Sequence, residues 1–133
     1  MEKIPLSSNH KRAVSSSMYL IGQLADEIED ALNHTNSTAV KAFYQDIPDN
    51  KQETIRKTIA AIRNRITALA EKYQLDQREI IQSHYVTARK VKMWEVLNDT
   101  RAKRLKGFGD FPEKYTVEFD KDIQDLVALI EKI

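Results

Sequence analysis

Residues 55–73, IRKTIAAIRNRITALAEKY, decide the fold of this chain. Apolar side chains recur in this stretch at alternating spacings of three and four residues: Ile55, Ile59, Ile62, Ile66, Leu69 and Tyr73. Only a helix, with about 3.6 residues per turn, brings positions so spaced onto one side. The stretch therefore predicts an amphipathic helix whose apolar stripe enters a core.

The same periodicity appears elsewhere and predicts the rest of the architecture. Long helices are expected over four ranges: 8–34, 50–73, 76–106 and 117–132. A short helix is expected between the first two, over residues 38–47. Asn50 with Glu53, and Asp76 with Glu79, have capping-box spacing at two of the helix starts. Short links between long helices favour antiparallel neighbours. The sequence thus predicts an all-α, antiparallel four-helix bundle-like fold with one additional short helix, in a single domain over residues 1–133.

Composition bounds the classes of protein to which the chain can belong. Its 133 residues suit one domain with a single core. The absence of cysteine excludes disulfides, zinc-thiolate sites and thiol catalysis. No apolar run is long enough to span a membrane, and the first 14 residues, MEKIPLSSNHKRAV, lack the apolar centre of a secretory signal. We expect a soluble, cytoplasmic protein that does not contact a membrane.

The helix expected over 76–106 carries two apolar faces. At about 100° per residue, one face holds Ile80, Ala88, Val91, Trp94, Ala102 and Leu105, and the other holds Val86, Met93, Val96 and Leu97. An aromatic loop with Phe108, Phe111 and Tyr115 follows this helix. Methionine and aromatic side chains contribute large, adaptable contact areas to interfaces. We therefore expect the second face and the loop to bind a protein partner or a second copy of the chain, as in a homo-oligomer.

Charge is unevenly distributed although the net charge is only +1. Residues 51–106 hold 14 Lys and Arg against 6 Asp and Glu, whereas the remainder holds 7 against 14. A basic middle segment can face a polyanion, or acidic helices of the same fold can neutralise it. We favour internal neutralisation, and a nucleic-acid partner remains the alternative.

The stretch 69–80, LAEKYQLDQREI, resembles the helix-turn-helix of repressor-type DNA-binding proteins. The small residue Ala70 and the apolar residues beside the turn match that pattern, whereas Gln74 replaces the usual turn glycine. The resemblance implies a regulator whose major-groove contacts come from one helical stripe: Arg78, Gln82 and Arg89. Because the two flanking helices carry long continuous apolar stripes, we favour an ordinary antiparallel hairpin.

The spacing of Arg78 and His84 is similar to the Arg-x4–6-His signature of helical HEPN ribonucleases. That resemblance implies a phosphate-holding arginine and a histidine that acts in acid–base cleavage. Glu79 replaces the Asn, Asp or His that usually follows the arginine. His84 is instead expected on the core side of its helix, where a hydrogen-bonded, partly buried histidine is the ordinary role.

Metal and cofactor sites have little support in the sequence. Asp30 and His34 have helical i, i+4 spacing, but no second helix carries the ligands needed to complete a di-metal site. Neither glycine pattern typical of phosphate or dinucleotide binding occurs. We expect no cofactor, no metal and no catalytic residues, and interpret the chain as a small helical protein-interaction or regulatory module that acts by macromolecular binding.

Overall fold

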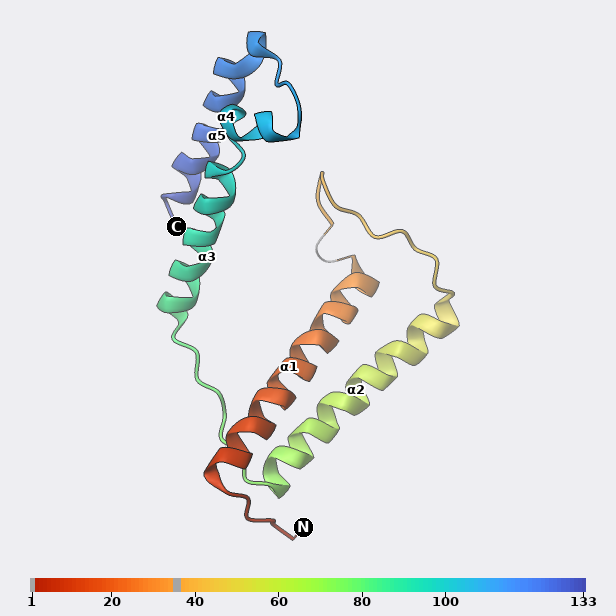
Figure 1. Ribbon diagram of the computed structural model, residues 1–133. Coiled ribbons are helices and arrows are strands. Elements are labelled where there is room, and N and C mark those ends of the chain that lie inside the picture. The colour runs from red at the N-terminus through yellow and green to blue at the C-terminus, as the bar shows by residue number, and fades with distance from the viewer. Residues whose placement is uncertain (1, 35–36) are drawn as a thin grey trace. The chain divides into compact units, whose positions relative to one another are not determined.

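The computed structural model describes residues 2–34 and 37–133. Across these residues the chain forms five α-helices and no strand, which confirms the prediction of an all-α fold. Within this chain the structure has two compact units, Met1–Arg78 and Glu79–Ile133. Each unit is a helical hairpin (Figure 1).

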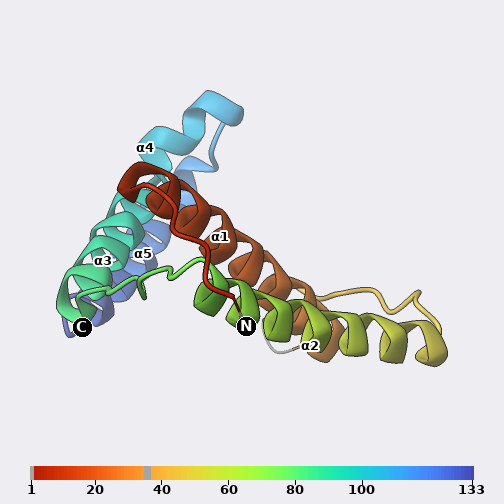
Figure 2. The same ribbon diagram turned by 90° about the horizontal axis from the view of Figure 1, so that it is seen from below.

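The first unit pairs α1, Ser8–Asn33, with α2, Asp49–Lys72. The two helices lie side by side in both views (Figures 1 and 2). Ser7 is the N-cap of α1, and its hydroxyl accepts a hydrogen bond of 3.2 Å from the backbone N–H of His10. Both helices begin and end within one or two residues of the ranges predicted from periodicity.

The connection between α1 and α2 corrects the prediction of a short helix over 38–47. The structure has an isolated bridge between Thr38 and Lys41 there, and no helix. The Thr38 hydroxyl accepts a hydrogen bond from the backbone N–H of Val40, a local turn that competes with helix formation. A segment of this length is also too short for an isolated helix to be stable, since most stand-alone helices below about 12 residues are marginal.

The α2 C-terminus confirms a sharp break at Gln74, whose φ is 53°. However, the segment after Gln74 is not helical up to Ile81, and the capping-box spacing of Asp76 and Glu79 starts no helix. Arg78 instead lies over the ring of Tyr19, 4.5 Å from guanidinium carbon to ring centroid. This contact with α1, together with the β-branched pair Ile80 and Ile81, opposes an early helix start.

The second unit contains α3, Gln82–Asn98, α4, Ala102–Leu105, and α5, Thr116–Ile130, with 3₁₀ turns at Lys106–Phe108 and Glu113–Tyr115. The predicted helix 76–106 is therefore wrong at both ends. Its C-terminal end divides because Asn98, Asp99 and Thr100 are poor helix formers. α3 and α5 lie side by side and form the hairpin (Figures 1 and 2).

Burial is sparse in both units. Only five of the described residues are buried, and all five are apolar: Ala25, Ile59, Ala102, Ile123 and Val127. Four large apolar side chains of α1 are instead exposed: Leu20, Ile21, Leu24 and Ile28. Each hairpin thus buries one narrow seam and leaves other apolar positions open to solvent.

Candidate interaction surface

The hairpin of the second unit is held by its buried seam and by two polar links. The backbone N–H of Ala102, at the start of α4, donates a hydrogen bond of 2.9 Å to the Asp120 carboxylate on α5. The Lys90 ammonium donates to the backbone carbonyls of Glu131 and Ile133, at 3.4 and 3.2 Å. These links fix α3, α4 and α5 relative to one another and position the side chains between them.

An apolar groove of 340 Å³ runs along one flank of the hairpin. Its walls come from α3 and α5 and contain one charged residue: Lys92, Met93, Val96, Leu97, Leu126 and Ile130. Met93 is 47% exposed, Val96 52% and Leu126 48%. The structure therefore brings three of the predicted interface residues, Met93, Val96 and Leu97, into one open apolar surface.

The fourth predicted residue of this face, Val86, does not line the groove. It lines a second hollow of 340 Å³, which shares Ile130 with the groove and has Val91, Trp94 and Ile133 among its other lining residues. Val91 and Trp94 were expected in the core, yet both are about half exposed. The two faces predicted for this helix are thus both left partly open within the second unit.

The aromatic loop has a mixed role. Phe111 packs against Phe119 of α5, with ring centroids 5.0 Å apart, so it contributes to the interior of the unit. Phe108 is 92% exposed, and about half of Tyr115 is exposed. Neither Phe108 nor Tyr115 lines the groove. The loop is therefore adjacent in sequence to the candidate surface but supplies none of its walls.

The sequence analysis did not predict that the last helix forms the second wall of the groove. Leu126 and Ile130 belong to the apolar stripe of the last helix. Their i, i+4 spacing places them on one side of α5, beside the α3 residues of the groove. The spacing therefore predicts that Leu126 and Ile130 share one face of the helix, but it does not predict that this face is exposed.

The residues of the DNA-binding alternative do not form one stripe. Arg78 precedes α3 and stacks on Tyr19, and Gln82 is the first residue of α3. The Arg89 guanidinium lies over the Tyr85 ring at 4.3 Å, and it donates a hydrogen bond of 3.3 Å to the Tyr85 hydroxyl. The nonhelical segment between α2 and α3 is also much longer than the turn of a helix-turn-helix.

The ribonuclease alternative requires Arg78 and His84 on one helix, and only His84 is helical. The prediction that His84 is partly buried is wrong, because its side chain is exposed on α3. Ile80, which was expected beside it, lies before the helix start. Arg78 lies in the nonhelical segment before α3, so the two residues on which that resemblance depends do not share a helix.

The first unit shows how part of the basic middle segment is neutralised. Arg63 of α2 donates hydrogen bonds to Glu29 at 3.0 Å and to Asp26 at 2.7 Å, both on α1. These bonds, the one to Glu29 first, raise the pKa of the Arg63 guanidinium above its already high usual value. Asp26 and Glu29 of α1 are thus ion-paired, and no group of three or more metal-ligating side chains gathers anywhere in ranges 2–34 and 37–133.

No known protein family, curated protein or solved structure matches the chain. Among the described helices, none combines the length and the apolar character that crossing a bilayer requires.

Proposed function

We propose that this protein is a helical interaction module that associates with a second copy of itself through the groove of α3 and α5. The observation that carries the proposal is the groove itself, whose side chains Met93, Val96 and Leu126 are each about half exposed. Completing the burial of each such side chain contributes about 1 kcal/mol, half the value for full burial. In a symmetric dimer, each of these side chains becomes buried in both copies of the chain.

The accessible surface of the chain supports the need for a partner. It amounts to 10865 Å². Two separate compact proteins with the lengths of the two units together expose only about 8,600 Å². The chain thus carries an excess of exposed surface even when each unit is considered alone. An excess of this size is comparable to the roughly 1,600 Å² buried in a standard protein interface.

Charge complementarity favours a second copy as the occupant of the groove. α3 holds three Lys and Arg against Glu95 alone, whereas α5 holds four acidic residues against Lys121 alone. A two-fold axis parallel to the helices places α3 of one copy over α5 of the other. Basic and acidic helices then meet on both sides of the apolar centre, with Lys92 at the rim of the groove.

Sedimentation velocity over a concentration series tests the proposal. We expect the wild-type protein to dimerise and the Met93→Glu variant to sediment as a monomer with unchanged helical circular dichroism, because a buried unpaired charge loses its hydration. Val117→Glu is the matched control, since Val117 is an exposed apolar residue of α5 outside both hollows. It should leave the dimer intact.

A second substitution keeps the test decisive if Met93→Glu unfolds the hairpin. Val96 is slightly more exposed than Met93, so Val96→Glu perturbs the hairpin less and the groove equally. A wild-type protein that stays monomeric at several hundred micromolar would contradict self-association, as would a dimer that both groove variants leave intact.

A further inference from the structure

The helices of the first unit leave one apolar face uncovered, and this face belongs to α1. Of the large apolar side chains in α1 and α2, the exposed ones all lie on α1, four of them in consecutive turns: Leu20, Ile21, Leu24 and Ile28. Each of the four is between 43% and 51% exposed. At about 100° per residue, the centre of this group lies roughly a quarter of a turn around α1 from the buried Ala25. The face is therefore separate from the buried seam of the hairpin.

Smaller side chains continue this face in both directions along α1. Ala13 and Ser17 share it and are exposed, and Ala31 lies at its other end. The Ser17 hydroxyl donates a hydrogen bond of 3.2 Å to the backbone carbonyl of Ala13. Because this bond satisfies the hydroxyl within α1, covering Ser17 with apolar atoms leaves no donor unpaired. The face can therefore be covered over its whole length.

An antiparallel second copy of α1 complements this face in size. When Leu20 lies opposite Leu24 of the other copy, Ile28 reaches the level of residues 16–17 of that copy. The small side chain of Ser17 leaves room for Ile28 there, as the close packing of two helices requires. Two-fold symmetry repeats each of these contacts. The large and small residues of the face are thus arranged so that the face is complementary to itself.

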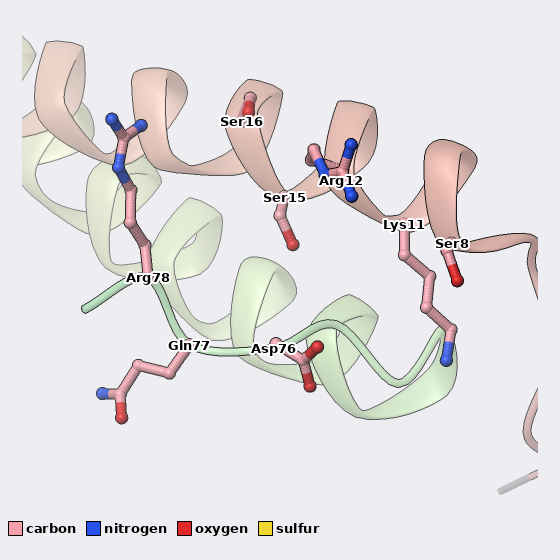
Figure 3. Close-up of a pocket in the computed structure, with 8 residues that line it drawn as sticks. All are labelled: Ser8, Lys11, Arg12, Ser15, Ser16, Asp76, Gln77 and Arg78. Atoms are coloured by element: carbon pink, nitrogen blue, oxygen red, sulfur yellow. The ribbon is translucent and has the colours of Figure 1, made fainter.

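The charges of α1 favour the same arrangement. Residues 8–20 hold two Lys and Arg and no Asp or Glu, whereas residues 21–33 hold four Asp and Glu and no Lys or Arg. An antiparallel pair places the basic half of one helix beside the acidic half of the other, and a parallel pair places like charges together. Figure 3 shows Lys11 and Arg12 leaving α1 in different directions. Arg12 is about five helical turns from Asp30 and therefore lies on the same flank of the face.

We propose that α1 pairs in antiparallel orientation with α1 of the second copy, in the same dimer that the groove of α3 and α5 forms. This inference rests on the proposed function, because it gives that dimer a second contact. Residues 73–81 join α2 to α3, so each contact raises the effective concentration at which the other forms. The two contacts stabilise the dimer together, and the loss of either one raises its dissociation constant.

Sedimentation velocity of the full chain measures this dissociation constant. We expect Leu24→Glu to raise it about 100-fold or more, because two-fold symmetry places two desolvated carboxylates in the contact. Leu24 is 44% exposed, so the hairpin should keep its helical circular dichroism, and Leu20→Glu, at a position 51% exposed, is the second variant. Ala60→Glu is the matched control, since Ala60 is exposed on α2. It should leave the dissociation constant unchanged.

Engineered cysteines test the direction of the two helices, since the chain has no cysteine of its own. Ala13→Cys and Ala31→Cys proteins, mixed and oxidised, should form a disulfide-linked pair, because the antiparallel register places residue 13 of one copy opposite residue 31 of the other. Each variant alone should remain a single chain on a non-reducing gel, because its two cysteines lie at opposite ends of the helix pair.

Two results would overturn the pairing of α1: a dissociation constant that neither Leu24→Glu nor Leu20→Glu changes, or no disulfide between the Ala13→Cys and Ala31→Cys proteins. Neither result bears on the groove, which is tested by the loss of the dimer in Met93→Glu. A dimer that Met93→Glu leaves intact and Leu24→Glu disrupts would instead reject the proposed function and retain the pairing of α1.

Discussion

Gly22 lies in the middle of α1, where a glycine weakens a helix because it has a large conformational freedom to lose. In the structure, a Cβ built at this position meets no atom within 4 Å. A close approach by another helix therefore does not explain the glycine in the first unit, and Gly22→Ala carries no steric penalty there.

The effect of Gly22→Ala on the free energy of unfolding then comes only from the higher helix propensity of alanine. We expect the free energy of unfolding to rise by about 0.5–1 kcal/mol. Urea unfolding followed by far-ultraviolet circular dichroism measures this change. Ala13→Gly, at an exposed position of the same helix, is the converse control and should lower the free energy of unfolding by a similar amount. If Gly22→Ala lowered the stability, a helix would have to contact Gly22 in solution, and the reasoning from open space would fail.

Two further substitutions test the seams that hold the hairpins. Ile59→Ala should lower the free energy of unfolding by about 2–5 kcal/mol, because Ile59 is 3% exposed and its loss leaves a cavity; a loss below about 1 kcal/mol in urea unfolding would place Ile59 outside the core. Asp120→Ala should cost about 1 kcal/mol, as for other helix caps, and should speed hydrogen exchange at the Ala102 amide, which loses its acceptor. Unchanged exchange at that amide would mean that the bond does not form in solution.

Periodicity was enough to predict the elements whose stability comes from a long apolar stripe. α1, α2 and α5 match their predicted ranges because each carries such a stripe over many turns. The segment 38–47 also has helical spacing, but it is too short for periodicity to outweigh the turn at Thr38. The length of an apolar stripe, as much as its spacing, therefore decided which predicted helices the structure contains.

Contacts between distant residues account for what the sequence could not show. Arg78 to Ile81 include good helix formers, yet the stacking of Arg78 on Tyr19 keeps this segment extended. The exposure of Met93 and Leu126 likewise depends on how α3 and α5 meet, which spacing within one helix does not specify.

Each hairpin is built from one continuous stretch of chain, and this has a consequence for the order of folding. The paired helices are joined by residues 34–48 in the first unit and 99–115 in the second. Because the entropic cost of closing a loop grows only slowly with its length, helical proteins dominated by such local contacts fold in microseconds to milliseconds. During synthesis, at about 5–20 residues per second, α1 and α2 have seconds to pair before α5 is complete. The exposed apolar residues of α1, such as Leu24 and Ile28, are therefore presented to solvent and to other nascent chains before the second unit has folded, and they stay exposed in the complete chain.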